Sequence, residues 1–89
     1  MLWHTNQRNK ERTILIEERV LDTIRKVAEW NEPLLPEQSL KNYLGMDSLH
    51  IADLAYELEA EFPIHISSRD IENWKTVGDV IAMVRRKLN

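Results

Sequence analysis

Asp47, Ser48 and His50 bring a carboxylate, a hydroxyl and an imidazole into one short stretch of the chain. These are the groups from which a serine nucleophile and its general base are built. Side chains two residues apart on a helix point to nearly opposite sides, so His50 is poorly placed to take a proton from Ser48. The chain also lacks the Gly-x-Ser-x-Gly turn that presents a serine nucleophile in one large class of hydrolases. A hydrolase is therefore disfavoured, and no catalytic residue is predicted.

A second kind of chemistry suits a serine at the start of a helix. Gly45 allows an unusual backbone angle, and Asp47 can accept a hydrogen bond from the first turn, so a helix is predicted to begin at or next to Ser48. Unpaired N–H groups and a partial positive charge at this end favour a phosphate ester. Ser48 could thus carry a phosphodiester-linked group or could simply be a second capping residue. The spacing alone leaves both readings open.

The residues that follow Ser48 have the period of an amphipathic helix that ends near Phe62. Its apolar face consists of Ile51, Leu54, Ala55, Leu58 and Phe62. Its other face, which is mixed but mostly acidic, carries His50, Asp53, Glu57 and Glu61. This face is predicted to lie in solvent and to be available to partners.

Two further long helices are predicted, over residues 13–30 and 76–88. The first has the apolar stripe Ile16, Val20, Ile24 and Val27. The last has the stripe Val77, Val80, Ile81, Val84 and Leu88. Thr76 and Asp79 lie at the spacing of a capping box, and Ser67 with Asp70 predicts a short helix just ahead of them.

Residues 31–46 show no helical period, and Pro33 and Pro36 exclude a continuous helix there. A loop of this length in a small domain must be held down by its own side chains or serve a function. The leucines and the tyrosine of the segment are expected to anchor it: Leu34, Leu35, Leu40, Tyr43 and Leu44. The predicted fold is all-α, a bundle of three main helices plus one short helix, with a long first loop.

From about Thr13 to Leu88 the chain resembles an acyl carrier protein. The resemblance rests on the run Leu44-Gly45-Met46-Asp47-Ser48-Leu49, on the Glu-x-Glu-Phe end of the following helix, and on a short helix before a last helix that begins Thr-Val. It implies a carrier domain over residues 13–89. Residues 1–12 would form an N-terminal extension, either a frayed, flexible arm or a leading continuation of the first helix.

The resemblance implies that Ser48 receives 4′-phosphopantetheine from coenzyme A. A magnesium-dependent phosphopantetheinyl transferase would attach it, and acyl-loading, condensing or acyl-transfer enzymes of one pathway would act on thioesters at its thiol. This cofactor would supply the thiol that a chain without cysteine lacks. Asp47 would cap the helix and contact the transferase, and Leu49 with Ile51 would pack beside the arm. The protein itself would be a carrier and not an enzyme.

Partner enzymes are predicted to dock on the helix that Ser48 opens, where acidic groups would attract basic surfaces. The residues predicted to contact them are His50, Ile51, Asp53, Tyr56, Glu57 and Glu61. By resemblance, Glu59 also matches an acidic position of this helix. His50 and Ala60 stand where the family usually has acids, and Tyr56 where a smaller residue is common. These departures suggest a carrier of a specialised pathway rather than the general fatty-acid one. The resemblance itself implies fatty acid, polyketide or other lipid metabolism.

Length, charge and composition disfavour several other classes of protein. The chain has 89 residues, enough for one domain, and a net charge of −3, which disfavours a general nucleic-acid binder. No apolar run has the length of a membrane span, and the histidines are too scattered to predict a metal site. A cytoplasmic monomer is expected.

Two alternative functions remain open. One is an aminoacyl or peptidyl carrier, although those usually have Gly-Gly ahead of the serine motif. The other is an unmodified helical interaction module.

Overall fold

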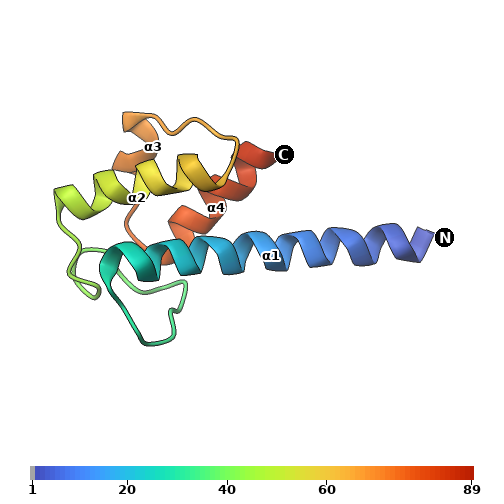
Figure 1. The fold of residues 1–89 in the computed structure, drawn as a ribbon, viewed down its shortest axis with the longest axis horizontal. Coiled ribbons are helices and arrows are strands. Elements are labelled where there is room, and N and C mark those ends of the chain that lie inside the picture. The colour runs from blue at the N-terminus through green and yellow to red at the C-terminus, as the bar shows by residue number, and fades with distance from the viewer. Residues whose placement is uncertain (1) are drawn as a thin grey trace.

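The structure is a computed structural model that describes the backbone of residues 2–89 and the side chains of residues 14–89. Four helices follow one another along this part of the chain: α1 (Leu2–Ala28), α2 (Ser48–Glu61), α3 (Ser68–Glu72) and α4 (Val77–Leu88) (Figure 1). The described residues form no β-sheet; their β-type pairing is an isolated antiparallel bridge between Ser39 and Thr76. The predicted all-α class, with three main helices and one short one, is confirmed.

Helix α1 begins at Leu2, well ahead of the expected Thr13, so the structure describes residues 2–12 as helix. The side chains of residues 2–13 lie outside those that the structure describes. A domain boundary near residue 13 stays a prediction. None of the described helices has an apolar stretch long enough to span a bilayer.

Helix α1 ends at Ala28, earlier than the expected Trp30, because the chain turns left-handed at Glu29, whose φ is 53°. The N–H of Trp30 then donates to the carbonyl of Arg25 at 2.9 Å, which closes the helix end. This is the geometry that glycine usually provides at a helix C-terminus. A glutamate there gives no such sequence signal.

The core forms where α1 packs against α2 and α4. Val20 and Ile24 of α1 have no exposed surface, as the predicted stripe requires. Their fully buried partners are Leu54 and Leu58 of α2 and Val77, Val80 and Val84 of α4. Burial of these side chains, each worth about 1.5–3 kcal/mol relative to exposure, fixes the helices as one unit.

The long loop is fastened to the beginning of α4. Leu40 N–H donates to Lys75 O at 3.0 Å, Val77 N–H donates to Gln38 O at 3.0 Å, and Gly78 N–H donates to Pro36 O at 2.8 Å. Loop carbonyls thereby pair the first-turn N–H groups that a helix cannot pair for itself.

The loop's apolar side chains anchor it only in part as expected. Leu34, Leu40 and Leu44 are buried, but Leu35 and Tyr43 are 51% and 55% exposed, so the expectation that those two anchor the loop is wrong. The Tyr43 ring instead lies against Trp30, with centroids 5.5 Å apart.

The two predicted capping boxes are present. Ser67 and Asp70 close the start of α3, and Thr76 and Asp79 close the start of α4. Asp70 also pairs with Lys87 of α4 at 2.8 Å, which ties the short helix to the last one. The Lys87 ammonium, together with hydrogen bonds from Ser67, lowers the pKa of Asp70 to about 2.

Gly78 lies close to the loop, since its N–H donates to the carbonyl of Pro36 at 2.8 Å. A Cβ there would lie 3.1 Å from the carbonyl oxygen of Pro36 and 3.3 Å from its Cβ.

Replacing glycine by alanine inside a helix normally stabilises by about 1 kcal/mol. We expect Gly78→Ala instead to destabilise by about 1 kcal/mol, because the methyl group displaces a hydrogen-bonded carbonyl. Urea unfolding measures this, with Ala82→Gly at an exposed position of α4 as calibration. Stabilisation by Gly78→Ala would show that the loop retreats freely.

The tie between α3 and α4 should be visible in the pH dependence of stability. Because folding lowers the pKa of Asp70, its carboxylate stabilises the fold above the ordinary aspartate pKa of about 4, and this contribution is lost as the pH falls toward 2. Asp70→Asn should therefore cost at most about 2 kcal/mol near neutral pH, and progressively less from pH 4 to pH 2. Lys87→Met should reduce the same pH dependence. A parallel stability–pH curve for Asp70→Asn and wild type would contradict this.

Candidate functional site

Ser48 is the first residue of α2, and Asp47 caps that helix as predicted. Asp47 has an extended backbone, and its Oδ1 accepts a hydrogen bond from the N–H of His50 at 3.0 Å. In return, the N–H of Asp47 donates to Nδ1 of His50 at 3.2 Å. The pair forms a capping box in which histidine takes the place usually held by glutamate or glutamine. Ser48 is exposed between these two residues.

The imidazole of His50 is therefore engaged with Asp47. Its Nδ1 lies 2.9 Å from Oδ1 of Asp47 as well as next to the Asp47 N–H. The hydrogen bond from the His50 N–H, and secondarily the nearby imidazole, hold the pKa of Asp47 below its usual value. The described contacts of His50 serve the helix start, and the geometry adds no support for a serine nucleophile activated by this histidine.

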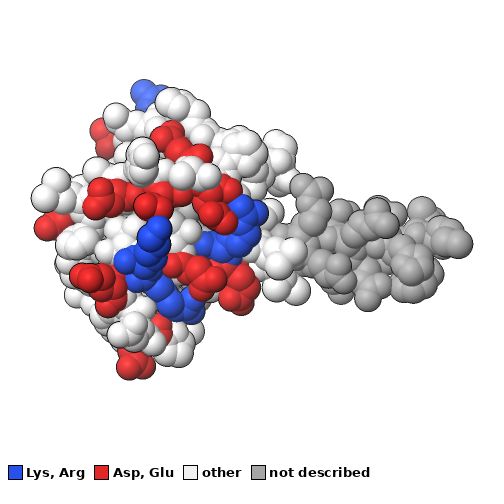
Figure 2. Space-filling model, in the orientation of Figure 1, with Lys and Arg blue, Asp and Glu red and all other residues white. Residues whose placement is uncertain are grey.

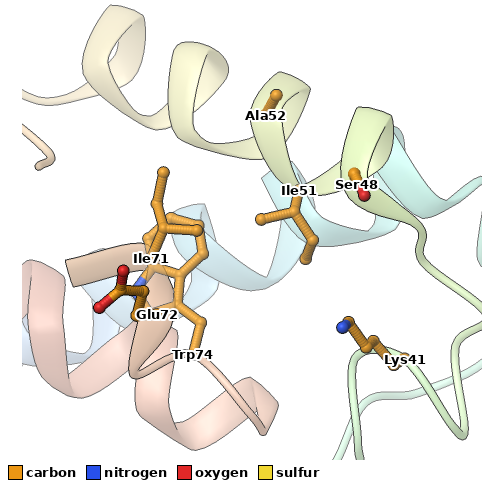
Figure 3. A pocket seen from close by; sticks show the side chains of 7 residues that line it. All are labelled: Lys41, Ser48, Ile51, Ala52, Ile71, Glu72 and Trp74. Atoms are coloured by element: carbon orange, nitrogen blue, oxygen red, sulfur yellow. The ribbon is translucent and has the colours of Figure 1, made fainter. Parts of the chain in front are cut away.

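Beside Ser48 lies an open cleft of about 340 Å³. It is lined by Lys41, Ser48, Ile51, Ala52, Ile71, Glu72 and Trp74. Figure 3 shows Ser48 and Lys41 on one side of the cleft, and Ile71, Glu72 and Trp74 on the other. The side chain of Ile51 points into the space between them (Figure 3). The cleft is apolar in the middle and carries one charged residue on each side.

The two apolar residues that were predicted to pack beside an arm on Ser48 lie in different places. Ile51 lines the cleft together with Ser48, whereas Leu49 does not line it and is 75% exposed. Tyr56, 71% exposed, is the other large apolar side chain of α2 that is open to solvent. Roles for Leu49 and Tyr56 in binding stay predictions.

The acidic residues predicted to meet partners are partly neutralised by α1. Lys26 Nζ lies 3.1 Å from Glu57, and Arg19 donates to the Glu61 carboxylate at 2.8 Å and to its carbonyl oxygen at 2.6 Å. Figure 2 shows these two signs of charge interleaved on the face that α1 and α2 form. Asp53 has no ion pair among the described residues and is exposed.

Other members of the cleft were not predicted as site residues. Lys41 lies in a loop without periodicity, and Ile71 and Trp74 carried only the signal of apolar contacts of the short helix. Their approach to Ser48 depends on how the long loop and the α3 region lie relative to α2, which no local pattern specifies.

Comparisons with known proteins agree on one family, and the family model covers most of the chain. The phosphopantetheine attachment site family matches residues 18–84. An acyl carrier protein of an Exiguobacterium species is 44% identical over 52 residues, which is 58% of this chain and 66% of that protein. An acyl carrier protein of Thermotoga maritima is 38% identical over 52 residues, covering 58% of this chain and 64% of that protein. The chain thus spans just under two thirds of the length of these relatives.

A solved structure is similar as well. A Mycobacterium tuberculosis protein provisionally assigned as an acyl carrier protein superposes with a TM-score of 0.77 at 42% identity, and the match covers 80% of this chain and 96% of that one.

The all-helical fold, together with the family match over residues 18–84, defines a carrier domain. The chain belongs to the phosphopantetheine attachment site family, in its acyl carrier branch. The cofactor of this family is 4′-phosphopantetheine. Acyl carrier proteins are carriers rather than catalysts.

The residues around Ser48 fit such a group. The hydroxyl is exposed at the positive end of α2, which favours a phosphodiester, and Lys41 places a cation on the same side of the cleft. The apolar side chains of Ile51, Ile71 and Trp74 offer a surface to the less polar part of an arm.

The start of α2 should depend on Asp47. We expect Asp47→Ala to lower the thermal stability and to accelerate exchange of the His50 amide, because that N–H loses its acceptor. In the wild type the same protection should decline as the pH falls through the lowered pKa of Asp47, whereas the variant should show no such decline. Hydrogen exchange followed by NMR measures both. His50→Gln, which restores a usual capping-box residue, is the control and should retain protection; unchanged exchange in Asp47→Ala would contradict the capping role.

Proposed function

We propose that this chain is an acyl carrier protein in which Ser48 bears 4′-phosphopantetheine through a phosphodiester and presents acyl thioesters to the enzymes of one biosynthetic pathway. The observation that carries the proposal is the position of Ser48: exposed at the first position of the capped helix α2 and lining a cleft of about 340 Å³. The chain performs no chemistry of its own in this role.

The chain's residues bind and orient the group. When attached, phosphopantetheine supplies the thiol on which acyl groups are held. Asp47 fixes the first turn of α2 and so the direction of the Ser48 side chain, and it is the residue next to Ser48 that a transferase would contact. Ile51, Ile71 and Trp74 form the apolar surface beside it.

Partners are proposed to approach along α2. They comprise a phosphopantetheinyl transferase and the acyl-loading, condensing or acyl-transfer enzymes of a cytoplasmic pathway, acting on a monomer. His50, Ile51, Asp53, Tyr56, Glu57 and Glu61 remain the proposed contact residues. Because Glu57 and Glu61 are paired with α1, Asp53 and Tyr56 are the members of this set most open to a partner. The residue types at positions 50 and 56 of this set, a histidine and a tyrosine, support a specialised pathway over general fatty acid synthesis.

The test is intact-protein mass spectrometry after incubation with coenzyme A, magnesium and a broad-specificity phosphopantetheinyl transferase. We expect a mass gain equal to one phosphopantetheine group, and none in Ser48→Ala. Ser68→Ala is a matched control, because Ser68 is likewise the exposed first residue of a capped helix. That variant should be modified as fully as the wild type.

The outcomes separate the alternatives. A gain that persists in Ser48→Ala would place the attachment elsewhere. The absence of any gain with several transferases, in protein whose helical circular dichroism is intact, would contradict the carrier function and favour an unmodified helical interaction module. Loading by aminoacyl rather than acyl donors, once the arm is attached, would favour an aminoacyl carrier.

A further inference from the structure

Lys41 is the one cationic residue that lines the cleft, and Glu72 is the one anionic residue. The two lie on different sides: Figure 3 shows Lys41 on the side of Ser48 and Glu72 across the cleft, next to Trp74. Lys41 thus supplies the positive charge in the cleft lining on the Ser48 side, and it belongs to the loop rather than to α2, while the Asp47 carboxylate next to Ser48 caps α2 and does not line the cleft.

The backbone of Lys41 is held in place even though its side chain is exposed. Gly45 N–H donates to the carbonyl of Lys41 at 3.1 Å, and Met46 N–H donates to the carbonyl of Leu40 at 3.0 Å. Leu40 next to it is 1% exposed and so anchors this turn in the core. The root of the Lys41 side chain is therefore fixed relative to Ser48, and a contact made by its ammonium costs little backbone entropy.

The ammonium of Lys41 has no acidic partner among the described residues. Most described cations are paired: Arg19, Arg25, Lys26, Arg85, Arg86 and Lys87 all form ion pairs. Arg69 and Lys75 also have no ion pair among the described residues, but neither of them lines the cleft. An unpaired cation beside Ser48 complements a singly charged phosphodiester.

We propose that Lys41 is a positioning residue that pairs with the phosphate of a phosphodiester-linked arm on Ser48 and directs the arm over the cleft. This inference rests on the function proposed above. With its phosphate held on the Lys41 side, the arm starts toward Ile51 and Trp74 rather than toward solvent. The preference is electrostatic and exposed, so it should change the ratio of docked to free arm by about twofold to fivefold and weaken with salt.

The experiment compares the phosphopantetheinylated wild type with phosphopantetheinylated Lys41→Gln, Lys41→Arg and Arg69→Gln. Arg69→Gln is the matched control, because it removes an unpaired cation outside the cleft and changes the net charge equally. The readouts are the ³¹P transverse relaxation of the phosphodiester and the shift of the Trp74 indole N–H resonance between the unmodified and modified forms. Trp74→Phe assigns that resonance.

We expect slower ³¹P relaxation and an indole shift reduced about twofold or more in Lys41→Gln, with Lys41→Arg and Arg69→Gln close to wild type. Salt at 0.5 M should bring the wild type close to Lys41→Gln. Equal relaxation and equal shifts in wild type and Lys41→Gln, in fully modified protein, would overturn the role of Lys41 and leave the carrier function standing. The same loss in Arg69→Gln would also overturn it, as a general charge effect. If mass spectrometry shows no modification, the proposed function fails, and this inference fails with it.

Discussion

The hydrogen bonds between the long loop and the beginning of α4 are the constraint on which the site depends. The carbonyls of Pro36 and Gln38 accept from the first N–H groups of α4, and Leu40 is held by Lys75. These bonds solve two problems at once, because a helix start needs acceptors and a loop without secondary structure needs anchors. Residues 40–47 continue directly from this attachment into α2. The position of Ser48 relative to α3 and α4 is therefore set by a backbone contact rather than by side-chain packing alone.

Much of the fold could be predicted because it is encoded locally. The stripes that bury Val20 and Ile24 follow from helical spacing, and the boxes at Ser67–Asp70 and Thr76–Asp79 follow from residue types three positions apart. The misjudged end of α1 has a local cause of another kind: Glu29 adopts a left-handed conformation that its side chain does not favour.

In the candidate site, too, the features encoded by local sequence could be predicted and those that depend on tertiary packing could not. Asp47 as a cap could be predicted from one short motif, whereas its reciprocal bond with His50 was missed because histidine is not the usual third residue of a capping box. Lys41 and Trp74 reach Ser48 only through the packing of three separate segments. For the same reason the ion pairs Lys26–Glu57 and Arg19–Glu61 could not be foreseen, since they depend on the register of α1 against α2.

Those ion pairs change what the outer face of α2 presents. Two of its carboxylates have cations within 3.1 Å, so the field over the face is weaker than its count of acidic residues suggests, and long-range attraction of a basic partner is correspondingly reduced. Leu49 and Tyr56, at 75% and 71% exposure, dominate what remains, with Asp53 between them in sequence. Full burial of a large apolar side chain is worth about 1.5–3 kcal/mol, more than an exposed ion pair usually contributes. If partners approach Ser48 along α2, as proposed, matching the shape of Leu49 and Tyr56 would therefore contribute more to binding than opposing the charge of the helix.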